Sequence, residues 1–164
     1  MVPGPRWTHI ALPVNDVEAS AEWYGRFTPL EVVDNRRDAD GNAVWLADGS
    51  SRENPFVLVL VAMDADAGHV RATLAPFAHL GFELPSVEAV TEIAARGARD
   101  GCLAWEPQHL PPPVGYICAL RDPDGNIVEF SFDQGVYAKV REHWSAPAGA
   151  TSGEPAGDGE GTRA

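Results

Sequence analysis

Residues 122–132 read Asp-Pro-Asp-Gly-Asn-Ile-Val-Glu-Phe-Ser-Phe, a sequence that predicts a tight turn leading into a strand. The turn combines proline, whose φ is fixed, with glycine and with short polar side chains that hydrogen-bond to nearby backbone. In the strand, positions 128, 130 and 132 form one apolar face, while 127, 129 and 131 point the other way. Glu129 therefore lies in the middle of an otherwise apolar strand. A buried carboxylate needs a partner, and a metal ion is one candidate.

The length and composition of the chain restrict its class. The chain has 164 residues, which fits one domain or two small halves that share a core. Its formal charge of −12 argues against nucleic acid as a partner. No run of about 18 apolar residues is present, so no membrane span is expected. The first residues lack the apolar region of a signal peptide, and we therefore expect a cytoplasmic location.

The rest of the sequence predicts the order strand, helix and three strands, repeated once. An offset of 70 residues places His9 on His79 (79 − 9 = 70) without a gap. Residues 17–19 and 87–89, which both read Val-Glu-Ala, then coincide. Such self-similarity indicates an internal repeat. The same offset carries Glu129 back to Val59 (129 − 70 = 59), which lies in a continuous apolar strand.

These patterns predict an α+β fold of two tandem βαβββ modules. The first module covers 6–63, a linker 64–74, and the second module 75–133. A terminal helix is expected over 134–144. Residues 145–164, rich in Gly, Ala, Pro and Ser, are expected to be disordered because they cannot bury enough apolar area. The helix of the second module is predicted to end near Arg96, before Gly97, and His109 to lie in a loop.

Three side chains of this repeat are candidate metal ligands. His9 and His79 open equivalent strands, and Glu129 lies in the last strand of the second half. Two imidazoles and one carboxylate suit Fe(II), Mn, Zn, Co or Ni and leave coordination positions open for a small-molecule substrate. The alternative is a metal-free pocket in which Glu129 is hydrogen-bonded to the two imidazoles.

The histidine strand openings, the repeat and the Asp-Pro-Asp-Gly-Asn-x-x-Glu motif together resemble the vicinal oxygen chelate superfamily, over roughly residues 6–133. This group includes glyoxalase I, extradiol dioxygenases, fosfomycin-resistance enzymes and bleomycin-resistance proteins. The resemblance implies that the paired modules form a curved mixed-sheet cup with the metal on its concave face. It also implies that His9, His79 and Glu129 are ligands. A homodimer is expected, in which modules pair within one chain or across two chains.

One departure from the family pattern narrows the expected function. The position of a further ligand in glyoxalase I lies near Val59, where the chain is apolar. The three-ligand pattern of extradiol dioxygenases and fosfomycin-resistance enzymes is therefore favoured, and the cation cluster of a phosphonate site is not visible. We expect a metal-dependent enzyme with dioxygenase-like chemistry, in which His109 or Tyr116 serves as acid or base. The alternatives are a metal-free drug-sequestering protein and a metal-dependent lyase or isomerase.

Overall fold

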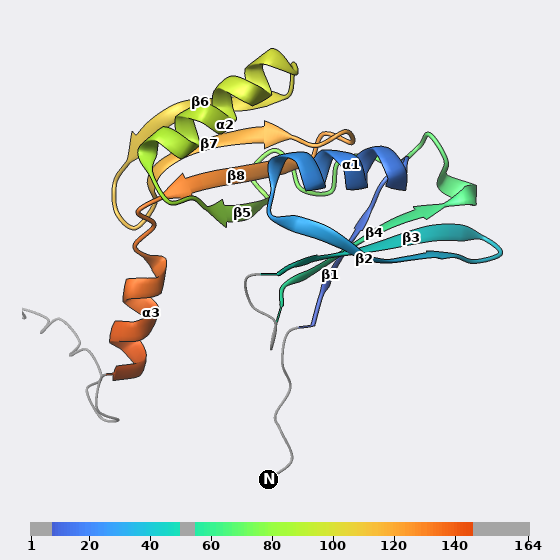
Figure 1. Ribbon diagram of the computed structural model, residues 1–164, viewed down its shortest axis with the longest axis horizontal. Helices are drawn as coiled ribbons and strands as arrows, with labels where there is room; N and C mark the ends of the chain where they lie inside the picture. Colours follow the sequence, from blue (N-terminus) through green and yellow to red (C-terminus); the bar gives the residue numbers. More distant parts are fainter. Residues whose placement is uncertain (1–7, 50–54, 146–164) are drawn as a thin grey trace, which may run out of the picture.

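The computed structural model describes residues 8–49 and 55–145, and the elements follow one another in the predicted order (Figure 1). The elements of the first half are β1 (Ile10–Pro13), α1 (Val17–Phe27), β2 (Leu30–Arg37), β3 (Gly41–Asp48) and β4 (Val57–Met63). A short 3-10 turn, η1 (Asp64–Asp66), begins the connection between the halves. The elements of the second half are β5 (His79–Glu83), α2 (Val87–Arg99), β6 (Leu103–Leu110), β7 (Gly115–Arg121), β8 (Ile127–Phe132) and the final helix α3 (Val136–Ser145).

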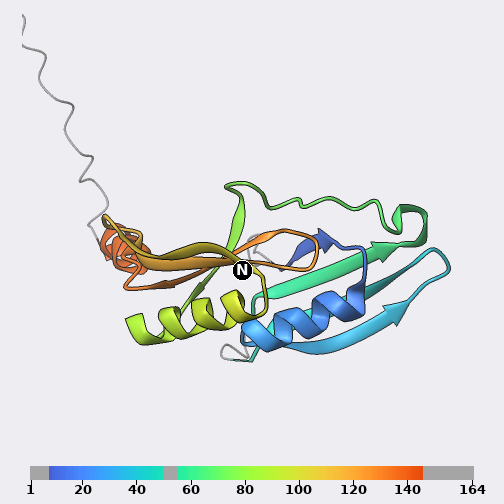
Figure 2. The same ribbon diagram turned by 90° about the horizontal axis from the view of Figure 1, so that it is seen from above.

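Each half forms its own four-stranded mixed sheet. The strand orders are β1-β4-β3-β2 and β5-β8-β7-β6, and in each sheet one parallel pair is followed by two antiparallel pairs. Both α1 and α2 lie on the same side of the two sheets, as Figures 1 and 2 show. Helix α3 projects from the end of the second sheet toward the side opposite α2 (Figure 1). This α+β arrangement confirms the predicted fold class.

The strand register repeats with the offset found in the sequence. Ile10 of β1 is paired with Leu58 of β4, and Leu80 of β5 is paired with Val128 of β8. The residue number of each partner is higher by 70 in the second pair than in the first (80 − 10 = 70 and 128 − 58 = 70). The helix caps repeat as well, because the side chains of Asp16 and Ser86 accept hydrogen bonds from the third residue beyond each.

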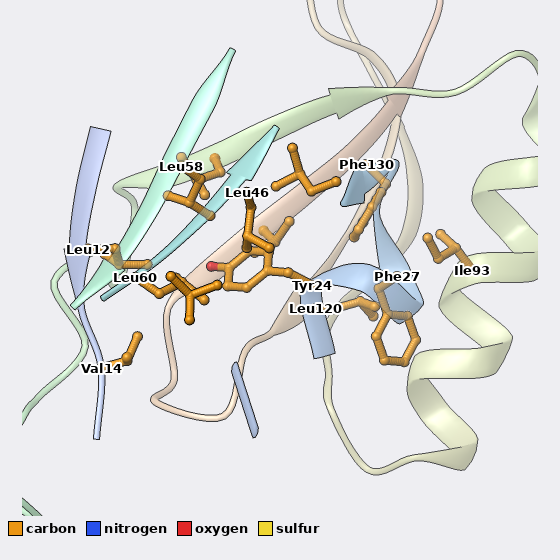
Figure 3. Packing of buried hydrophobic residues seen from close by; sticks show 14 of the residues in the cluster. Leu12, Val14, Tyr24, Phe27, Leu46, Leu58, Leu60, Ile93, Leu120 and Phe130 are labelled. Atoms are coloured by element: carbon orange, nitrogen blue, oxygen red, sulfur yellow. The ribbon is translucent and has the colours of Figure 1, made fainter. Parts of the chain in front are cut away.

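The two halves share one hydrophobic core beneath the helices (Figure 3). Alternation along the central strands sends every second side chain toward the helices. Leu58 and Leu60 of the first sheet and Val128 and Phe130 of the second are fully buried in this core. Tyr24 of α1, also fully buried, points into the same cluster.

The Tyr24 hydroxyl reaches the turn that precedes β8. It donates a hydrogen bond to Asp122 Oδ2 over 3.0 Å. The Asp122 carboxylate also accepts bonds from the backbone N–H of Asp124 and from the backbone and side chain of Asn126. Burial raises the pKa of the Asp122 carboxyl, although these donors oppose the rise, and the pKa of Tyr24 is raised for the same reason. The turn predicted from the sequence thus ties the second half to α1.

A second set of bonds joins the halves at the start of α1. The Asn15 side chain donates to Asp124 Oδ1 and to the carbonyl oxygen of Val70, and it accepts from the Val70 N–H over 3.0 Å. Since Val70 belongs to the connection between the halves, Asn15 holds three separate segments together. The same turn binds the connection through Asn126 Oδ1, which accepts from the N–H groups of Thr73 and Leu74.

Two boundary predictions were wrong. Helix α2 continues through Gly97 to Arg99, because Gly97 packs directly against Leu120 of β7 and the helix ends only before Gly101, whose φ is +73°. Strand β6 extends to Leu110, so His109 lies on a strand rather than in a loop. Register shifts between Trp105 and Gln108 accommodate the extra length. The final helix was predicted near its observed place, and the predicted disordered tail lies almost entirely outside the described residues.

Candidate metal-binding site

The open face of the second sheet, opposite α2, carries His79 and Glu129. Because Val128 and Phe130 point into the core, the side chain of Glu129 between them points to the open face. On the neighbouring strand, Leu80 is buried in the core, and His79 projects from the open face. Gly81 is the strand partner of Glu129 and has open space where a side chain would lie. The absent side chain at Gly81 therefore leaves room beside the carboxylate.

The orientation of the His79 ring is set by the backbone before it. Nδ1 lies 2.7 Å from the carbonyl oxygen of Phe77. A carbonyl oxygen only accepts hydrogen bonds, so Nδ1 carries a hydrogen and Nε2 of the neutral ring keeps its lone pair. Nε2 lies 3.7 Å from Oε2 of Glu129. The Trp105 ring of β6 meets the imidazole edge-to-face, with the ring centroids 6.0 Å apart.

Glu129 is almost completely buried, with a side-chain exposure of 6%. Its other oxygen, Oε1, accepts a hydrogen bond from the side-chain amide of Gln134 over 3.0 Å. Burial raises the pKa of the Glu129 carboxyl, and the nearby His79 partly offsets this rise. Sequence reasoning missed Gln134. The available signal was an amide residue directly beyond the end of the strand that carries Glu129.

His9 does not join this pair within one chain. It is exposed, and its Nδ1 lies 3.0 Å from the hydroxyl of Thr8. Across residues 8–49 and 55–145, no group of three or more His, Cys, Asp or Glu side chains lies close enough together to hold a metal ion. Val59, the repeat equivalent of Glu129, is 5% exposed and supplies no ligand atom. The chain therefore brings together two of the three predicted ligands.

The donor atoms of this pair fit a divalent metal ion. Bonds from zinc to imidazole nitrogen and carboxylate oxygen are about 2.0–2.2 Å long, and two such bonds together exceed the 3.7 Å between Nε2 and Oε2. Without a cation or a proton between them, two electron-rich atoms would face each other. The bond from His79 to a carbonyl and the bond from Gln134 to Glu129 are also of the kind that orients metal ligands.

His109 and Tyr116 lie together on the opposite face of the sheet. Their ring centroids are 4.5 Å apart, and the Tyr116 hydroxyl lies 3.2 Å from that of Thr91 on α2. Tyr116 shares its face with Cys118, whose thiol donates to a carbonyl of α2. The structure thus separates these two residues from Glu129, and their catalytic role stays a prediction.

A cavity of about 520 Å³ opens beside His79. Residues of both halves line this cavity, and most of the lining side chains are apolar or aromatic: Ile10, Pro29, Leu30, Asp48, Phe56, His79, Leu80, Gly81, Phe82, Glu83 and Tyr137. Tyr137 comes from the first turn of α3, so this helix forms part of the wall. The cavity is large enough for a small organic molecule.

Comparison with known families agrees with this architecture. Residues 6–130 match the model of the Glyoxalase/Bleomycin resistance protein/Dioxygenase superfamily. The chain belongs to this superfamily. A relative within it, the uncharacterized protein PA2024 of Pseudomonas aeruginosa, is 39% identical over 131 residues, which cover 79% of this chain and 90% of the relative.

Several solved structures share the fold at low sequence identity. The glyoxalase I of Leishmania major, described as trypanothione-dependent, is 19% identical with a TM-score of 0.61, covering 87% of this chain and 100% of that chain. TnmS3, an antibiotic binding protein from a Streptomyces species, is 21% identical with a TM-score of 0.56. The match covers 80% of this chain and 98% of that chain. Proteins with this fold thus include both an enzyme and a binding protein, and these similarities show the fold alone.

Proposed function

We propose that this protein is a metal-dependent enzyme that acts on a small oxygenated molecule at the His79–Glu129 site. The observation that carries the proposal is the 3.7 Å gap between Nε2 of His79 and Oε2 of Glu129, with the other polar atom of each side chain already engaged. When bound there, a divalent metal ion supplies Lewis-acid chemistry to a substrate that chelates it through two oxygens.

The protein side chains have separate tasks in this proposal. His79 and Glu129 hold the ion, while Trp105 packs against His79 and restricts the approach to it. The cavity beside His79, which Phe82 and Tyr137 help to line, receives the apolar part of the substrate. Two imidazoles and one carboxylate leave adjacent positions open, which favours dioxygenase-like chemistry over a lyase or isomerase reaction.

The third ligand in the proposal is His9 of a second copy of the chain. Within residues 8–49 and 55–145 of one chain, His9 does not come together with His79 and Glu129. His9 lies directly before β1, and His79 begins β5. Both β1 and β5 are edge strands, so each is open to association with another chain. A homodimer in which these edges meet would complete the site.

Metal content and mixed dimers test the proposal. Elemental analysis of the purified protein is expected to find one transition-metal ion per chain. H9A, H79A and E129A are expected to lack it. The control H69A, which alters an exposed histidine of the connection between the halves, is expected to keep the metal.

The pairing is tested by co-expressing H9A and H79A with different tags and isolating the mixed dimer. A site shared between chains leaves one intact combination, the unchanged His9 of one chain with the unchanged His79 of the other, and therefore restores one metal per dimer. A site within one chain restores none. Full metal content in H9A would remove His9 from the ligand set.

A second candidate function is metal-free sequestration of a small molecule. The predominantly apolar lining of the 520 Å³ cavity, with Ile10, Phe56 and Phe82 in its walls, favours this candidate. Chelator-treated protein would then bind a hydrophobic dye as well as untreated protein does. Displacement of the dye by catechols, hemithioacetals or phosphonates would identify the class of compound. A strict requirement for metal in these measurements would argue against sequestration.

A further inference from the structure

Gln134 lies at the junction between β8 and α3, and its side chain touches the carboxylate of Glu129. We propose that Gln134 is the positioning residue of the metal site, fixing the Glu129 carboxylate so that it presents Oε2 to the ion. This inference rests on the proposed metal-dependent function. It adds a residue that lies outside the predicted ligand set and has no ligand role of its own.

Two backbone features flank Gln134. Asp133, directly before it, has a φ of +58°, which a residue with a side chain seldom adopts. Gly135, directly after it, donates its N–H to the carbonyl oxygen of Pro113 over 2.9 Å. The loop between β6 and β7 therefore fixes the backbone on the far side of Gln134, so the amide is supported at a set position beside β8.

The chemistry of the contact distinguishes the two carboxylate oxygens. An amide N–H₂ group only donates, so the Oε1 bound by Gln134 acts as an acceptor and has less capacity for another partner. Oε2 points toward Nε2 of His79. A carboxylate held by one oxygen cannot turn freely about its last bond, and the ligand atom stays directed into the gap. Such supporting hydrogen bonds contribute measurably to metal affinity.

The decisive variant is Q134M, which preserves the length of the side chain but removes the donor. Calorimetric titration with Co(II) is expected to give affinity about 10- to 100-fold below that of the wild type. Q134N, whose amide is one methylene too short, should behave in the same way. The control Q108M makes the identical chemical change at an exposed position of β6 and should leave affinity within about 2-fold, the spread common for an exposed site.

A double-mutant cycle, measured in the presence of a chelator, tests the contact between Gln134 and Glu129 in metal-free protein. The four proteins are the wild type, Q134M, E129A and the double variant, and their free energies of unfolding are compared by urea denaturation. Non-additive changes are expected, because the two side chains touch. Additive changes would overturn the proposal, whatever the protein does with metal.

The titration separates this proposal from the function on which it rests. If E129A abolishes Co(II) binding but Q134M binds as tightly as the wild type, Gln134 has only a structural role and the positioning proposal is wrong, while the metal site stands. If the wild type binds no metal, both proposals are overturned together. Weakened binding in Q134M with a non-additive cycle supports both.

Discussion

At the scale of single residues, Glu129 places an ionisable group where burial opposes its charge. Its carboxylate is buried beside the side chains of His79 and Gln134. Burial raises the pKa of the carboxyl group above the ordinary value of 4.5. A carboxyl group with a raised pKa binds its proton more tightly in the folded state. Its contribution to stability is therefore fully present below about 4.5 and is lost as the pH rises through the folded pKa.

Replacement of this acid gives the first prediction. In chelator, E129Q is expected to be more stable than the wild type at pH 8, with an advantage that shrinks as the pH falls to 4. The physical reason is that glutamine stays neutral while glutamate ionises in a desolvated place. Urea unfolding across this pH range measures the difference. A difference independent of pH would show that Glu129 titrates alike in the folded and unfolded chains.

The limits of sequence reasoning also appear at this scale. Alternation in the strand was enough to place Glu129 on the face opposite the core, and the repeat was enough to align His9 with His79. The alignment does not say whether equivalent side chains meet, since that depends on how the two sheets are packed. The position of Gln134 depends on Asp133, whose φ is positive, and on the loop that contains Pro113. Neither feature leaves a periodic pattern in the sequence.

At the scale of elements, the helices of the two halves differ in their fit to the sheets. Each contains a glycine, but a Cβ on Gly97 of α2 would lie 2.1 Å from a side-chain carbon of Leu120, while one on Gly25 of α1 would lie 3.8 Å from the nearest atom. Leu120 is fully buried and cannot swing away. Gly97 is thus required for close packing, which is also why glycine failed as a stop signal there.

These glycines give a matched pair of variants. G97A is expected to lower the free energy of unfolding by about 1–3 kcal/mol through overpacking. G25A makes the same change where space is free and should raise it by about 0.5–1 kcal/mol, because alanine favours the helix. Urea denaturation of both proteins provides the comparison. A loss of stability in G25A equal to that in G97A would contradict this explanation.

At the scale of the whole molecule, the two halves depend on each other through the turn that begins at Asp122. Asp122 and Asp124 were predicted only to shape this turn, and they do so, but they also accept bonds from Tyr24 and Asn15 of the first half. The turn motif could be identified from the sequence because its residue types are specific. Its partners could not, because they lie about 100 positions away.

Removal of the Asn15 side chain tests this dependence. N15A loses the side-chain bond to Asp124 and the bonds to both polar atoms of Val70, while the backbone N–H of residue 15 still donates to Asp124. We expect a loss of about 2–3 kcal/mol in the free energy of unfolding. N35A, at an exposed position of β2, should change it by no more than about 0.5 kcal/mol. Equal effects of the two variants in urea denaturation would show that the bonds of Asn15 contribute little.

The equal register of the two halves bears on redesign of the chain. Ala11 faces Val59 in the first sheet as Gly81 faces Glu129 in the second. A glutamate introduced at 59, together with a glycine at 11, would give the first half of this repeat the acid and the cleared space that the second half already has. The two sheets of one polypeptide would then present equivalent carboxylates, each paired across the strands with a glycine.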